Sequence, residues 1–354
     1  MSILEQEHKI RMRNNILKAI HFDCPDYIPM MFIINEASWY YYPEDFLYRM
    51  MDEHRFLFPS MNREMYIKRS TCEEPGKPFT DGWGCVWETM VKGIVGEVTK
   101  HPLKDWSDFG NYKSPNPLVD SGKGPINWSN VKQDLDTAKA NNELAIGRLR
   151  HGHTFLNLVD IRGYENLMFD FHDNVPQLGK LIAMLEDFNM ALVKNFVDRG
   201  AEMIKYPEDL GAQTGPMITP QMFRKYIRPS YERLYKYAID RNIIVHVHSD
   251  GNLHLFADDL IALGVNVLNL QDTVNGIDWI RDNLKGKVCL ELDIDRQNVT
   301  AFGTPQQIDD FVRLEIKTLS SKEGGLMMIY DLYPNVPLEN IKAVMDAMEK
   351  YAFS

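Results

Sequence analysis

Two histidines and an aspartate alternate at the end of an apolar run in residues 243–252, IIVHVHSDGN. Side chains at every second position of a β-strand point to the same face, so His246, His248 and Asp250 should form one column. Neutral imidazole and carboxylate are good ligands for zinc. We therefore predict His248 and Asp250 as metal ligands and His246 as a substrate contact beside them. The competing interpretation is a core histidine bonded to a backbone carbonyl, and it is strongest for His246.

Acidic residues also follow the other apolar runs in the second half of the chain. After AEMIKY, VNVLNL, KVCLEL and LMMIY come Glu208, Asp209, Asp272, Asp293, Asp295 and Asp331. Crowded carboxyl groups repel one another, so a cation or a protonated acid is expected among them. Asp209, Asp272 and Asp295 have a simpler use as caps of the helices that follow. Glu208 and Asp331 lack that use, so both are predicted acid–base groups, and Glu208 is also a predicted metal ligand.

The elements that must position these residues alternate regularly from residue 143 onward. Apolar runs cover 143–149, 201–206, 242–248, 265–270, 287–292 and 324–330, and helix-like segments cover 176–199, 220–241, 253–263, 304–321 and 337–351. Near-continuous apolar strands separated by helices are typical of a parallel sheet. Together with a strand at 27–35 and a third strand near 167–170, the count is eight. This predicts an α/β fold, a (β/α)8 barrel, whose chemistry lies where the strands end. A doubly wound open sheet is the alternative.

The segment 36–142 is irregular and rich in aromatic residues, with SWYYYP, DGWGCVW and KDWSDFGNYKSPNP. We expect an insertion of loops and short helices on the substrate side of a single domain, residues 1–354, after an amphipathic helix at 3–20. The predicted substrate contacts are Asn35, Glu36, Trp39, Tyr40 and Tyr206. For the aromatic residues of the insertion, packing within it is an equally good interpretation.

The bulk properties exclude several classes of function. The chain has 354 residues, a net charge of −11 and a sequence pI near 5.4, which disfavour nucleic acid or an anionic membrane as partner. The start of the chain lacks the apolar centre of a signal peptide, and no run is long enough for a membrane helix. The four cysteines, Cys24, Cys72, Cys85 and Cys289, form no CxxC pair, so a cytoplasmic location is expected. No glycine-rich phosphate loop is present.

Several blocks of the sequence resemble the uroporphyrinogen decarboxylase superfamily. They are DGWGCVW with HPLKDWSDFGNYKSPNP, EDLGAQTGPMITPQMFRKYIRPSYERL, HSDGN, DIDRQNVTAFGTPQQI and VPLENIKAVMDAMEKY. Their order and spacing cover nearly the whole chain, and the resemblance also implies a (β/α)8 barrel. True decarboxylases carry an arginine-rich segment after the first strand. The matching segment here, MMFIINEASWYYYP, has no arginine, so porphyrinogen decarboxylation is not expected.

The other branch of the superfamily consists of corrinoid-dependent methyltransferases. In members that methylate thiols, zinc is held by a His-x-Cys pair and a later cysteine. Here His248 matches that histidine, while Asp250 and Tyr330 replace the two cysteines, and Asp331 follows Tyr330. A site of harder donors suits polarisation of a substrate oxygen. Ether demethylation needs this, because the departing oxygen must be stabilised, and Tyr330, Asp331 or Glu208 could supply a proton. Asp250 also belongs to this predicted catalytic set.

The resemblance therefore implies a methyltransferase that moves a methyl group from a small O-methylated compound, such as an aromatic methyl ether, to cob(I)alamin. The chain has no DxHxxG segment, so the corrinoid is expected on a separate protein, and zinc is the expected resident metal. A homodimer is compatible with the sequence. Two alternatives stay open: a decarboxylase of a small acid or tetrapyrrole, and a non-catalytic tetrapyrrole-binding protein.

Overall fold

The computed structural model describes residues 3–59 and 74–354, with the side chains of the first helix described from residue 12 onward. Cys72 and part of the predicted insertion lie outside these ranges. Contacts divide the chain into two compact units. The first joins Met1–Lys77, Thr89–Gly96 and Asn269–Ser354, and the second joins Pro78–Glu88 and Glu97–Leu268. The single-domain description stays a prediction.

Seven strands form one sheet, in the order β1-β12-β11-β10-β9-β6-β5. Their bounds are Met30–Ile34 (β1), Ile146–Arg148 (β5), Met203–Asp209 (β6), Ile244–Asp250 (β9), Val267–Gln271 (β10), Cys289–Asp293 (β11) and Leu326–Leu332 (β12). Within this sheet, from β5 to β12, each strand lies beside the sheet strand that follows it in the chain, and β12 lies beside β1. A separate two-stranded sheet of β7 (Gly211–Ala212) and β8 (Gly215–Pro216) lies between β6 and β9 in the sequence. A doubly wound sheet would instead reverse direction at a switch point. The order confirms the (β/α)8 class of fold.

The predicted third strand near 167–170 is wrong, because these residues belong to helix α6 (Tyr164–Asp173). Leu167 and Phe171 are both buried, and their spacing of four residues puts them on one face of a helix. Asn174 ends the helix in the left-handed conformation, with φ 55°. The sheet therefore has seven strands within the described residues.

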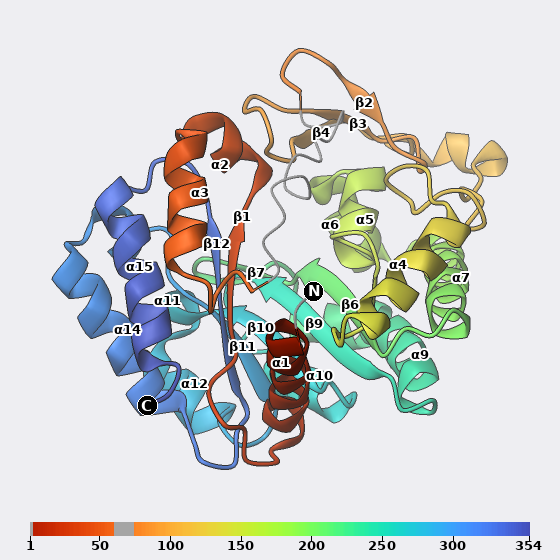
Figure 1. Cartoon of the computed structure of the whole chain (residues 1–354). Helices are drawn as coiled ribbons and strands as arrows, with labels where there is room; N and C mark the ends of the chain where they lie inside the picture. The colour runs from red at the N-terminus through yellow and green to blue at the C-terminus, as the bar shows by residue number, and fades with distance from the viewer. Residues whose placement is uncertain (1–2, 60–73) are drawn as a thin grey trace. The chain divides into compact units, whose positions relative to one another are not determined.

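In the first unit, β1 pairs with β12 and β12 with β11, all parallel. Its helices are α1 (Ile3–His21), α2 (Glu36–Tyr41), α3 (Glu44–Glu53), α11 (Asp272–Asn275), α12 (Ile277–Asn283), α13 (Val299–Phe302), α14 (Pro305–Leu319) and α15 (Leu338–Tyr351). Thr304 and Gln307 form a capping box that starts α14. This helix packs against α15 (Figure 1).

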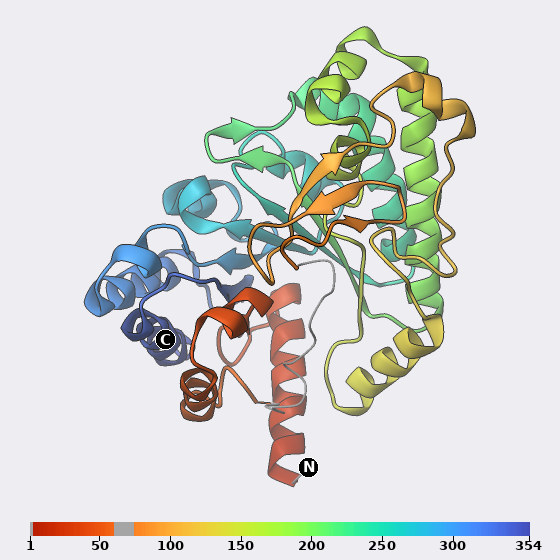
Figure 2. The same cartoon turned by 90° about the horizontal axis from the view of Figure 1, so that it is seen from above.

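In the second unit, β5, β6 and β9 are paired parallel. Its helices are α4 (Trp128–Ala140), α5 (Phe155–Arg162), α6, α7 (Pro176–Asp198), α8 (Pro220–Met222), α9 (Arg228–Ile239) and α10 (Ala257–Ala262). Figure 2 shows α7, which has 23 residues, as the long yellow-green helix of this unit. The predicted helix at 220–241 is interrupted by a π turn at Phe223–Ile227. Pro229, which lacks an N–H donor, follows this turn.

The insertion contains more regular structure than predicted. Besides α2, α3 and α4 it holds a 3₁₀ helix, Trp106–Asn111, and a small antiparallel sheet of β2 (Phe79–Thr80), β3 (Val86–Glu88) and β4 (Glu97–Lys100). No described helix combines the length and the apolar character needed to cross a membrane.

Candidate functional site

The pairing of β6 with β9 places the strand-end residues side by side. Asp209 pairs with Asp250 and Pro207 with His248, so Asp209, His248 and Asp250 share one face of the sheet. We call it the metal face. The two residues predicted together, His248 and Asp250, do lie together: His248 Nε2 is 3.8 Å from Asp250 Oδ1.

Two imidazoles converge on Asp209. His151, in the loop after β5, places its Nε2 3.3 Å from Asp209 Oδ1, and His248 places its Nε2 3.7 Å from the same atom. One ligand atom from each of the three residues lies within 4.8 Å of the other two. Two atoms bound to a tetrahedral zinc at 2.0–2.1 Å lie roughly 3.3–3.4 Å apart. The three side chains, which we call the metal triad, therefore fit a zinc-sized ion with little movement.

The charges of the triad support one another. Burial lowers the pKa of His151, but the hydrogen bond and charge of Asp209, with Glu208 and Asp250 nearby, outweigh this and raise it. Burial raises the pKa of Asp209, but His151, His248 and the N–H of Asp250 outweigh this and lower it. The triad therefore favours an ionised Asp209, as a metal ligand requires, whereas His151 must give up its proton before it can bind a metal.

Asp250 lies at the edge of the triad. Its backbone N–H donates to Asp209 Oδ1 at 3.1 Å, and its side chain is 40% exposed. It is close enough to His248 to serve as a fourth ligand, while its exposure also leaves it accessible to substrate.

Glu208 points away from the metal face, because adjacent residues of a strand alternate. It is fully buried. Its carboxylate accepts the backbone N–H groups of Thr154, Phe155 and Leu156 at 3.0, 2.8 and 3.0 Å, and Tyr231 Oη donates to it at 2.9 Å. Burial raises its pKa, and these four donors oppose that rise. Glu208 thus holds the start of α5 against β6 and does not join the triad in this arrangement.

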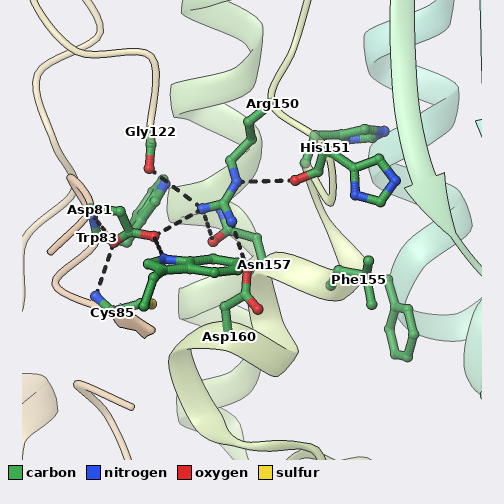
Figure 3. Close-up of polar contacts among 12 residues, drawn as sticks. Asp81, Trp83, Cys85, Gly122, Arg150, His151, Phe155, Asn157 and Asp160 are labelled. Atoms are coloured by element: carbon green, nitrogen blue, oxygen red, sulfur yellow. Dashed lines mark hydrogen bonds and ion pairs between the residues drawn. The ribbon is translucent and has the colours of Figure 1, made fainter. Parts of the chain in front are cut away.

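Arg150 fixes the other side of the loop that carries His151 (Figure 3). Its buried guanidinium donates to Asn157 Oδ1 at 2.9 Å and to Asp160 Oδ2 at 2.6 Å, both on α5. Nε donates to the backbone oxygen of His151 at 3.3 Å, and Nη1 lies 3.4 Å from Asp81 Oδ2.

Asp81 connects this arginine to the small sheet. One oxygen accepts the N–H groups of Trp83 and Cys85, both at 2.9 Å, and the other accepts the indole N–H of Trp87 at 2.9 Å. Figure 3 shows this turn and α5 on either side of the guanidinium. The turn before β3 is therefore tied to the loop of His151 through Arg150.

The remaining predicted residues of the second unit lie on both faces of the sheet. His246 is 2% exposed and shares the metal face with His248. Tyr206 lies on the opposite face of β6, fully buried, and its hydroxyl donates to Leu234 O at 3.3 Å. The structure therefore does not bring Tyr206 to the triad.

In the first unit, Tyr330 and Asp331 point to opposite faces of β12. Tyr330 is fully buried, its hydroxyl donates to Thr300 Oγ1 at 2.9 Å, and burial raises its pKa. Asp331 is partly exposed, and its Oδ2 lies 3.9 Å from Arg296 Nη1. A buried hydroxyl with a raised pKa is a poor source of a proton, so Asp331 is the more accessible of the two.

The four predicted substrate contacts near α2 have partners within the first unit. Asn35 caps α2 by accepting the N–H of Ser38 at 3.0 Å. Tyr40 donates to Glu36 at 3.4 Å and lies 4.4 Å beneath the Lys92 ammonium, and Trp39 packs on Tyr48 with ring centroids 5.2 Å apart. These contacts order the helix, and a role in substrate binding stays a prediction.

The capping interpretation is confirmed for Asp295, which accepts three N–H groups at the start of α13. For Asp209 the structure shows the triad in place of a helix cap. His151 was missed altogether. It lies three residues after the end of β5, in the segment RLRHGHT, and histidine directly after a predicted strand was the available signal.

Comparison with known proteins gives a family and a fold. No curated protein matches the sequence. A solved methyltransferase from Methanosarcina mazei has a TM-score of 0.66 at 16% identity, covering 96% of this chain and 98% of that one. The 3-keto-D-glucoside 4-epimerase of E. coli reaches a TM-score of 0.39 at 10% identity, over 63% of this chain and 84% of that one. The first likeness supports the fold alone.

The family model described as Uroporphyrinogen decarboxylase (URO-D) matches residues 153–351, more than half of the chain. The chain belongs to the uroporphyrinogen decarboxylase family.

Proposed function

We propose that this protein is the methyltransferase component of a corrinoid-dependent demethylase. It would take a methyl group from a small O-methylated compound and pass it to a corrinoid held by a separate protein. The observation that carries the proposal is the convergence of His151 and His248 on Asp209. The likeness in fold to a protein described as a methyltransferase supports it.

The triad would hold zinc through the two Nε2 atoms and the Asp209 carboxylate, with Asp250 beside them. When bound, the ion would act as a Lewis acid on the ether oxygen of the substrate. Asp209 keeps both imidazoles directed at one point. Arg150 and Glu208 fix the loop that presents His151. Asp250, which is partly exposed, lies where it can orient the substrate or exchange a proton with its oxygen.

The donor set favours oxygen chemistry over thiol chemistry. The triad offers two nitrogens and one carboxylate and no thiolate. Among the cysteines within the described ranges, Cys85 and Cys289 are buried and Cys24 is exposed, and none is part of the triad. Hard nitrogen and oxygen donors leave a bound ion more able to polarise an ether or phenol oxygen.

Decarboxylation of a small acid is the second candidate, because the matching family model is that of a decarboxylase. The segment after the first strand argues against a porphyrinogen substrate, since MMFIINEASWYYYP contains no arginine.

The test is methyl transfer to free cob(I)alamin, followed as methylcobalamin, with a panel of aliphatic and aromatic methyl ethers. We expect the zinc-loaded protein to methylate cobalamin with at least one donor. His248→Ala should abolish transfer, whereas His172→Ala, an exposed histidine on α6, should leave it unchanged. Release of CO2 from a panel of small acids, without methylation from any ether, would overturn the proposal in favour of the decarboxylase.

A further inference from the structure

A second row of polar side chains crosses the strands of the second unit. In the parallel register, Arg148 of β5 pairs with Lys205 of β6, and Lys205 pairs with His246 of β9. Registered neighbours in a sheet point to the same face. Two cations and an imidazole therefore stand side by side, and we call them the cationic row.

The cationic row shares the metal face. Lys205 precedes Asp209 by four residues, and His246 precedes His248 by two, so the alternation of a strand puts all four on one side. His248 lies two residues further along β9 than His246. At a rise of about 3.3 Å per residue, it is roughly 6–7 Å from the cationic row. The spacing is close to the length of a small para-substituted aromatic ring.

The row places two like charges next to each other. Like charges directly opposite each other on neighbouring strands are destabilising, and lysine is rarely buried unless it is paired. Lys205 is half-buried, yet its ammonium makes no hydrogen bond or ion pair with any residue in 12–59 or 74–354. Arg148 beside it is exposed, so a ligand can reach this end of the row from solvent.

The charge of the whole chain makes this arrangement more unusual. The net charge is −11, so cations are the minority, and two of them stand next to each other on the functional face.

We propose that the cationic row binds a carboxylate of the substrate, so that the methyl donor is an anionic compound held between the row and the metal triad. That the bound anion is a methyl donor rests on the proposed function, whereas binding of a carboxylate at the row does not. Arg148 supplies a two-pronged donor that matches a carboxylate, and Lys205 supplies a point charge.

The test compares 4-methoxybenzoate with 4-methoxybenzamide, which has nearly the same shape but no charge. Binding is measured by titration calorimetry on zinc-loaded and on zinc-free protein. We expect the benzoate to bind about 10- to 100-fold more tightly, as for one or two charge-assisted hydrogen bonds. The preference should persist without zinc. It should disappear in Lys205→Met and weaken in Arg148→Met.

Lys194→Met is the matched control, because Lys194 is an exposed lysine of α7 in the same unit, and it should keep the wild-type preference. Equal affinity for the two probes would overturn the subsite. So would a preference that requires zinc, because the carboxylate would then be on the metal. If the benzoate preference depends on Lys205 but no ether ever methylates cobalamin, the subsite stands and the proposed function fails. If cobalamin is methylated while charge has no effect on binding, the reverse holds.

Discussion

At the scale of residues, the adjacent acids Glu208 and Asp209 have different roles. Asp209 and Glu208 are adjacent, yet one lies among imidazoles on the metal face and the other accepts backbone N–H groups on the far face. Alternation along the strand decides this division. The sequence could have shown that only one of the two belongs with His248. It could not show which, because that depends on the register of β6 against β9.

Asp272 and Glu315, two buried acids of the first unit, should make the free energy of unfolding depend on pH. Burial raises the pKa of Asp272 to about 6, and burial together with Asp272 and Asp295 raises that of Glu315 well above its usual value. The folded state therefore holds these protons more tightly than the unfolded chain does. For Asp272 the resulting stabilisation is complete below about pH 4 and is lost as pH rises through about 6. For Glu315 it is lost as pH rises above the usual range of that carboxyl group.

For Asp272 alone the loss amounts to roughly 3 kcal/mol. In Glu315→Gln the side chain cannot ionise, so this variant should be more stable than wild type at pH 8 and similar to it at pH 5. Urea unfolding at the two pH values measures the difference, with the exposed Glu339→Gln as control. A wild type and a Glu315→Gln variant with parallel pH profiles would show that the pair carries no raised pKa.

At the scale of elements, the loop between β5 and α5 determines whether the triad can form. Its conformation was beyond sequence reasoning, since it depends on Arg150, Glu208 and Asp81, which come from distant segments. The strands themselves were predictable, because their apolar runs are nearly continuous. The strand predicted at 167–170 was wrong because an apolar run of that length fits either a strand or a buried helix.

Two buried arginines of the second unit separate support of the metal triad from general stability. Arg150 contacts His151, whereas Arg162 pairs with Asp170 at 2.7 Å and donates to Lys104 O at 3.0 Å. Replacing either by Met leaves a buried carboxylate without its partner, so each should lower the free energy of unfolding by about 3–5 kcal/mol.

Only Arg150→Met should also weaken zinc binding, by about 10- to 100-fold, as is typical when a group that orients a ligand is lost. Unfolding in urea and zinc titration on the same samples make the comparison. Equal losses of zinc affinity in both variants would assign the effect to stability alone.

At the scale of the whole molecule, the fold class followed from the alternation of strands and helices, and the strand order confirms it. The functional face was partly predictable for the same reason. Parallel strands end at one edge, so His248 and Asp250 of β9 were expected close to the acids that end β6. Two members of the triad were harder to predict. Asp209 was expected to cap a helix, and His151 lies in a loop whose conformation the sequence does not specify.

Zinc binding by wild type and by His151→Ala tests the metal triad most directly, because the structure, and not the sequence pattern, identified His151 as a member. Elemental analysis and titration should give about one zinc per chain for wild type and for the His172→Ala control. Loss of a residue that only orients a ligand weakens metal binding by about 10- to 100-fold. His151 is a proposed ligand itself, so His151→Ala should weaken zinc binding by at least about 100-fold. A wild type that binds no zinc, or a His151→Ala variant that binds it as tightly as wild type, would contradict the metal triad.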